Sequence, residues 1–94
     1  MRFSIISEIP GRTRLQLAGP VPESDLDALL KLSGEIDGVR KVRVYGRIGQ
    51  IALEYDESRR DAVLAAVGAL DARAIADAKS GYVMQLEPRK HKLV

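Results

Sequence analysis

The sequence predicts an α+β domain in which one antiparallel sheet carries helices on one of its faces. Two observations predict this class. Several short segments alternate apolar and polar residues, which is the pattern of a strand with one buried face, and two other segments repeat apolar residues at helical spacing. The 94-residue chain is 46% apolar and 30% charged, which suits a single globular domain.

Composition excludes several classes of function. The chain has no cysteine, so disulfides, zinc fingers, iron–sulfur clusters and thiol nucleophiles are excluded. One histidine, no tryptophan and a formal net charge of +2 argue against a catalytic triad and against a nucleic-acid-binding module. We therefore expect a cytosolic binding domain without a cofactor of its own, and not an enzyme.

Residues 2–17 are expected to be extended. In the second half of this segment, apolar residues alternate with Arg12, Arg14 and Gln16, as in a half-buried strand. Pro10-Gly11 interrupts the segment, and a proline within a strand belongs at an edge or a bulge. The segment is either one long strand bent at Pro10-Gly11 or two short strands, and we favour the bent strand.

A helix is expected to follow, beginning at Ser24 and ending before Gly38. Ser24 is a good N-cap residue, and Asp25 and Asp27 suit the positive end of the helix dipole. Gly38 suits the left-handed conformation that commonly ends a helix. The apolar residues that repeat at helical spacing are Leu26, Leu29, Leu30 and Ile36.

Two further strands are expected to form a hairpin. Residues 39–45 and 51–55 both alternate, and the two glycines of the segment 46–49 suit a tight connection. A second helix follows, in which Ser58 and Asp61 have the spacing of a capping box. Its buried stripe is expected to be Val63, Ala66, Val67 and Leu70.

The end of the chain is less regular. Residues 71–79 fit either a strand or a short helix, and Tyr82, Met84 and Leu86 alternate as a last strand before Pro88. The order strand, helix, strand, strand, helix, strand is that of the ferredoxin-like fold, a four-stranded antiparallel sheet with two helices on one face. Right-handed crossovers place the first and third strands at its centre. We expect one domain over residues 1–88 and a basic tail over 89–94.

Two stretches resemble a known family. Residues 9–17, with Pro10, Gly11, Arg12 and Arg14, resemble the Pro-Gly-Arg-x-Arg-Leu-x-Leu opening of the N-terminal heavy-metal-associated-like domains of bacterial heavy-metal-translocating P-type ATPases. Residues 36–56 resemble the Gly-Val, hairpin and Tyr-Asp core of the same family, through motif residues Gly38 and Val39 among others.

The resemblance implies that the chain is the cytoplasmic appendage of a pump in the bacterial inner membrane. The transported transition-metal ion and ATP then belong to the parent pump, and the partners of this chain are other domains of that pump. The basic tail over 89–94 would suit proximity to the membrane, leading toward a membrane segment of the parent.

The sequence departs from metal-binding relatives at one loop. Those relatives carry Met-x-Cys-x-x-Cys between the first strand and the first helix, where two thiolates hold a soft metal ion. Residues 19–25 contain no sulfur here, and their only carboxylates are Glu23 and Asp25. Two carboxylates at a helix start are more often partners of the helix dipole than metal ligands. We therefore expect a degenerate domain without a soft-metal site, in which Glu23 and Asp25 are at most weak ligands for a hard cation.

Arg12 and Arg14 are expected on one face of the first strand, and Arg43 projects from another strand. They form either the polar outer face of a one-sided sheet or a surface that docks on an acidic partner. We expect a regulatory or docking domain of the pump. The alternative is an independent βαββαβ interaction module that forms homodimers through its edge strands. An RNA-binding module needs exposed aromatic residues on its central strands. The first strand offers Arg14 and Gln16 instead, and the second strand offers Tyr45 alone.

Overall fold

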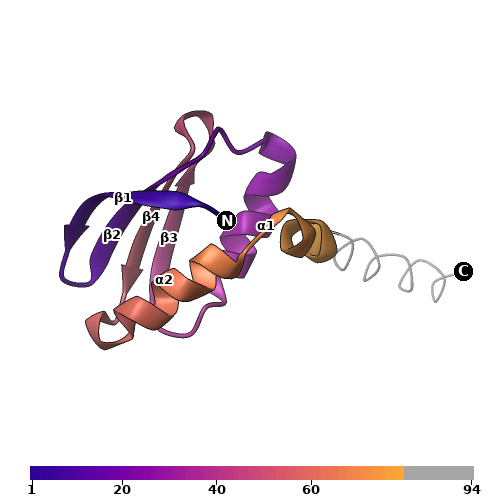
Figure 1. Cartoon of the computed structure of the whole chain (residues 1–94). Coiled ribbons are helices and arrows are strands. Elements are labelled where there is room, and N and C mark those ends of the chain that lie inside the picture. The colour runs from indigo at the N-terminus through magenta and orange to yellow at the C-terminus, as the bar shows by residue number, and fades with distance from the viewer. Residues whose placement is uncertain (80–94) are drawn as a thin grey trace, which may run out of the picture.

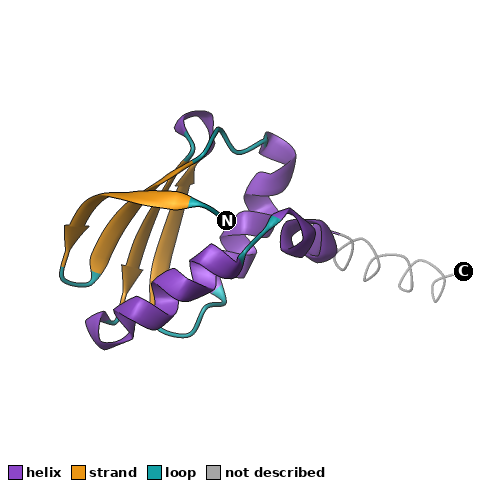
Figure 2. Ribbon diagram, in the orientation of Figure 1, coloured by secondary structure: helices purple, strands orange, loops and turns teal. Residues whose placement is uncertain are grey.

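The computed structural model describes residues 1–79 as a four-stranded antiparallel sheet with helices on one face (Figures 1 and 2). The strands lie side by side in the order β1-β2-β4-β3. Along the chain, the elements are β1 (Phe3–Ile9), β2 (Arg12–Leu17), α1 (Glu23–Gly34), β3 (Val39–Tyr45), η1 (Gly46–Ile48), β4 (Gln50–Tyr55), η2 (Glu57–Arg59), α2 (Arg60–Ala69) and a helix over 72–79. The predicted α+β class, with a four-stranded antiparallel sheet, is confirmed.

The first segment forms two strands, so the predicted single bent strand is wrong. β1 and β2 pair antiparallel, with Ile9 opposite Arg12 and Phe3 opposite Leu17. Pro10 and Gly11 make the turn between them, and Gly11 adopts a φ of +77°. Proline followed by a positive-φ glycine reverses the chain direction. The dipeptide therefore creates a hairpin, where a proline at a bulge would only bend one strand.

The hairpin changes the order of the elements. β1 takes the edge position beside β2, which the last strand holds in the ferredoxin-like arrangement. The central pair is β2 and β4, which are the predicted first and third strands. The predicted last strand over 82–86 and the predicted tail over 89–94 lie outside the described residues. The predicted strand–helix order is thus corrected at the N-terminus, where two strands precede the first helix.

The core lies between the sheet and the helices. β2 and β4 turn alternate residues toward α1 and α2, as their sequence pattern predicts, and Leu29, Val63 and Val67 meet them from the helices. Leu30 was expected on the buried stripe of the first helix, yet 38% of it is exposed. The buried strand residues are Thr13, Leu15, Leu17, Ile51, Leu53 and Tyr55.

The boundaries of the first helix differ from those predicted. α1 begins at Glu23 with Pro22 as its N-cap residue, so Ser24 lies in the first turn rather than at the cap. The helix ends at Gly34, and Gly38 lies in the following turn with a φ of +94°. Glycine is still needed at position 38, because left-handed backbone is costly for other residues, but it does not end the helix.

The predicted capping box of the second helix does not form. The Asp56 carboxylate accepts hydrogen bonds from the Ser58 backbone N–H at 3.1 Å and the Ser58 hydroxyl at 2.8 Å. Asp61 instead accepts from Arg60. An Asx turn therefore starts this segment, and α2 follows it. Residues 72–79, which fit a strand or a helix from sequence, are helical, and the Asp71 carboxylate accepts the Ala74 N–H at 2.8 Å.

Candidate functional site

The candidate site is the face of the sheet opposite the helices. Alternation on β2 and β3 turns four basic side chains to this face, which we call the basic face: Arg12, Arg14, Lys41 and Arg43. β4 runs between these two strands and contributes Ala52 and Glu54. The predicted docking residues Arg12, Arg14 and Arg43 are thus brought to one surface. Lys41 was missed, although it has the same strand parity as Arg43.

Strand register arranges the basic face in rows. Arg12 lies opposite Glu54, which lies opposite Lys41. In the next row, Arg14 lies opposite Ala52, which lies opposite Arg43. A shallow hollow of about 390 Å³ opens over these rows, lined mainly by the four basic residues with Ser7, Tyr45, Ala52 and Glu54. Each row therefore has two cations that flank one residue of β4.

The two rows differ in charge balance. Glu54 forms ion pairs with Arg12 at 3.2 Å and with Lys41 at 4.0 Å. The guanidinium carbon of Arg14 lies 5.2 Å from the centre of the Tyr45 ring, within the range of a cation–π contact. Within residues 1–79, Arg14 and Arg43 have no carboxylate within 4.0 Å. In the part of the chain that the structure describes, positive charge on this face is therefore uncompensated in the row that contains Ala52.

The motif residues Pro10, Gly11, Gly38 and Val39 lie elsewhere, at the end of β4. The Gly11 carbonyl accepts the Tyr55 N–H at 3.0 Å, and the Gly38 carbonyl accepts the Asp56 N–H at 2.9 Å. Two positive-φ glycines thus hold the end of β4 from both sides. These motif residues act in folding, whereas the motif residues Arg12 and Arg14 belong to the basic face.

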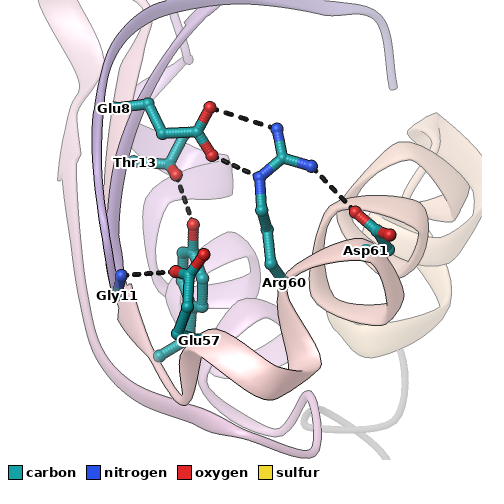
Figure 3. A network of polar contacts seen from close by, with 7 residues as sticks. Glu8, Gly11, Thr13, Glu57, Arg60 and Asp61 are labelled. Carbon is teal, nitrogen blue, oxygen red and sulfur yellow. Dashed lines mark hydrogen bonds and ion pairs between the residues drawn. The ribbon is translucent and has the colours of Figure 1, made fainter.

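A polar network joins the β1–β2 hairpin to α2 (Figure 3). Glu57 accepts the Gly11 N–H at 2.6 Å, and the buried hydroxyls of Thr13 and Tyr55 share a hydrogen bond of 2.5 Å. Between α2 and β1, Arg60 donates hydrogen bonds from two of its nitrogens to Glu8, and one of these bonds measures 3.1 Å. The network links segments far apart in the chain, so we interpret its role as structural: it holds the hairpin against α2.

Charge pairing in this network shifts two pKa values. Hydrogen bonding to Arg60 lowers the pKa of the Glu8 carboxyl below its ordinary value of 4.5. The hydrogen bonds that Arg60 donates to Glu8 and Asp61 raise the pKa of Arg60 further above neutrality. Both groups are therefore charged at neutral pH, which suits an ion pair and not proton transfer.

The carboxylates considered as metal ligands lie in the first turn of α1. Asp25 accepts a hydrogen bond from Lys79 at 2.9 Å, which links α1 to the helix over 72–79. Glu23 is exposed and lies two residues before Asp25. In the part of the chain that the structure describes, no three His, Cys, Asp or Glu side chains gather as a metal site would require.

Searches against known protein families, curated proteins and solved structures found no match. Among residues 1–79, no helix has the length and apolar character needed to cross a bilayer.

Proposed function

We propose that this chain is a docking or regulatory domain that binds an acidic protein surface through its basic face. The observation that carries the proposal is the row of Arg14 and Arg43, two guanidinium groups on an open sheet face without carboxylate partners among the described residues. Charged groups of this kind give a surface its specificity and speed of association.

The parent protein in this proposal is a heavy-metal-translocating P-type ATPase of bacteria. The support is the resemblance of residues 9–17 and 36–56 to the N-terminal domains of these pumps. The domain would lie on the cytoplasmic side of the membrane and dock on another domain of the same pump. It would regulate or assemble the pump without delivering metal, because the loop over 19–25 offers no sulfur ligand.

A protein partner fits the basic face better than a nucleic acid does. Glu54 lies among the four basic residues and would repel a continuous row of phosphates. Among residues 1–79, Tyr45 is the single aromatic residue that lines the hollow, and Arg14 lies over its ring. Base stacking on this face would first have to displace Arg14.

The pump assignment is tested by the reading frame beyond Val94. We expect an apolar stretch of about twenty residues soon after this position, the length needed to span a bilayer. A stop codon there would contradict the assignment and favour an independent module.

The docking function is tested by reversing charge on the basic face. In the full-length pump, Arg12→Glu with Arg14→Glu is expected to change metal-dependent ATPase activity by roughly fivefold or more, a usual size for coupling between domains. Lys31→Glu with Arg73→Glu is the control, because it makes the same change of charge at two exposed helical positions on the other side of the sheet. Equal activity in wild type and the Arg12/Arg14 variant, or equal effects of both variants, would contradict docking through this surface.

One observation favours a second candidate, self-association. β1 is an edge strand with no further strand beyond it among residues 1–79, and Ile5, Ile6 and Ile9 are 43%, 47% and 54% exposed. An apolar edge strand is open to pairing with a second copy. Under this candidate, sedimentation shows a dimer that Ile6→Lys dissociates, whereas a wild-type monomer at all concentrations removes it.

A further inference from the structure

We infer that Arg14 and Arg43 form a clamp for a single carboxylate group, bound over Ala52. The inference rests on the proposed docking function and specifies which part of the basic face binds the partner. The ligand is the side chain of a glutamate or aspartate on an acidic protein segment.

The neighbouring row shows the same arrangement already filled. Glu54 of β4 lies between Arg12 and Lys41, and both cations pair with its carboxylate, at 3.2 Å and 4.0 Å. The next row also has two cations on β2 and β3, but its central residue is alanine. The row of Ala52 therefore has two cations, as the row of Glu54 does, but its central residue on β4 is not a carboxylate.

The spacing of the strands allows one anion to contact both arginines. Adjacent strands lie about 4.8 Å apart, so the backbones of Arg14 and Arg43 are separated by about 10 Å across β4. The methyl group of Ala52 fills little of the space between them, and the hollow of about 390 Å³ opens there. Guanidinium groups that lean in from both sides can each donate to one carboxylate, which their planar geometry matches.

Tyr45 prepares one side of the clamp. Its ring lies beneath the Arg14 guanidinium at 5.2 Å. This contact restricts the arginine before a partner arrives, so less conformational entropy is lost on binding. Arg43 lies across the hollow from Arg14 in the register of the sheet.

Glu54 also limits the ligand to an isolated charge. It lies two residues from Ala52 on the same strand and face, which is about 7 Å away. A polyphosphate or nucleic-acid backbone laid along the strand would place a second charge close to Glu54. A protein segment can instead present one carboxylate with neutral neighbours.

The test supplies the missing acid from within the domain. Ala52→Glu places a carboxylate between Arg14 and Arg43, as Glu54 lies between Arg12 and Lys41. The matched control is Gln50→Glu, which makes the same change of charge on the same strand and face, but between Gln16 and Tyr45. The probe is a synthetic peptide of alternating glutamate and glycine, titrated into ¹⁵N-labelled domain with the backbone amides and arginine Nε–H groups observed.

We expect the peptide to shift the arginine signals of residues 14 and 43 and the amide signal of Ala52. Ala52→Glu is expected to weaken peptide binding roughly tenfold, which corresponds to about 1.4 kcal/mol. Gln50→Glu is expected to weaken it less than about threefold. A comparison titration with a hexathymidylate oligonucleotide is expected to give weaker binding than the peptide.

The possible failures are distinguishable. Equal weakening by Ala52→Glu and Gln50→Glu would overturn the clamp and leave a general electrostatic docking surface. Tighter binding of the oligonucleotide than of the peptide would overturn the carboxylate as ligand. If the peptide does not bind wild type, the clamp fails, whereas the docking function falls only if Arg12→Glu with Arg14→Glu also leaves the full-length pump unchanged.

A second measurement does not need a partner. At neutral pH, Ala52→Glu is expected to unfold at a higher temperature than Ala52→Gln, because the new carboxylate gains two cationic neighbours. This advantage should disappear in acid once the carboxyl is protonated. Equal unfolding temperatures at neutral pH would contradict a clamp that is ready to receive a carboxylate.

Discussion

Ser33 is a polar residue whose side chain is buried without a hydrogen-bond partner among the described residues. It lies in the last turn of α1 and is fully buried. A buried hydroxyl without a partner keeps the cost of its lost hydration. Ser33 therefore weakens the fold at a point where sequence alone indicates only an ordinary helical residue.

Replacing this hydroxyl tests that interpretation. Ser33→Ala is expected to raise the free energy of unfolding by about 1 kcal/mol, because it removes the desolvation cost and introduces a better helix former. The measurement is urea denaturation followed by circular dichroism. Loss of stability on this substitution would show that the hydroxyl has a partner after all.

The end of α1 shows how an element depends on individual glycines. Gly34 is the last helical residue, and a Cβ there would meet no atom within 4 Å beyond its chain neighbours and the backbone of its own helix. Gly38 has a φ of +94°, and a Cβ there would lie 2.9 Å from the Cβ of Arg59. The same substitution at two positions four residues apart therefore has opposite consequences.

Gly34→Ala is expected to stabilise the protein by roughly 0.5–1 kcal/mol through helix propensity and a less flexible unfolded chain. Gly38→Ala is expected to destabilise it by about 1 kcal/mol or more, through backbone strain and contact with Arg59. Thermal unfolding of the two variants gives the comparison. Effects of the same sign would show that the turn after α1 adjusts freely.

On the scale of the whole molecule, the N-terminal strand is held by the second helix. The Met1 amino group donates to the Gly68 carbonyl at 2.6 Å, and Glu8 pairs with Arg60 at the other end of β1. These contacts join residues more than fifty positions apart. They secure β1 at an edge of the sheet where it has only one neighbouring strand.

The pair of Glu8 and Arg60 predicts a pH dependence. The folded-state pKa of Glu8 is lowered, so the unfolded chain binds the proton more readily, and folding gains stability above the ordinary pKa of 4.5. That contribution is lost as the pH falls through the lowered folded value. Glu8→Gln should therefore be less stable than wild type at neutral pH and match it in strong acid, as measured by urea midpoints across pH. A difference between the two that does not depend on pH would contradict the ion pair.

Asp56 adds a pH dependence of stability with the same sign, because hydrogen bonds from Ser58 lower its pKa. This contribution is the same in wild type and in Glu8→Gln, so the comparison of the two proteins isolates Glu8.

The sequence by itself determined the faces of the strands. Alternation placed Leu15 and Leu53 in the core and Arg12, Arg14 and Arg43 on the opposite face, because a strand with one buried side needs a repeat of two residues. The same alternation also predicts that Lys41 lies on the face of Arg43. Pro10-Gly11 is also typical of a turn, although the bent strand that the sequence favours is wrong.

Only the tertiary structure decided the register of the strands and the pairing of β1. The hairpin of β3 and β4 and the central place of β4 follow from the order of the elements, but local pattern does not show that β1 folds back on β2, nor that Ala52 lies opposite both Arg14 and Arg43. Such pairings join residues that are distant in the chain, and their choice depends on how all faces are buried together. The rows of the basic face, and the clamp proposed within them, exist only after that choice is made.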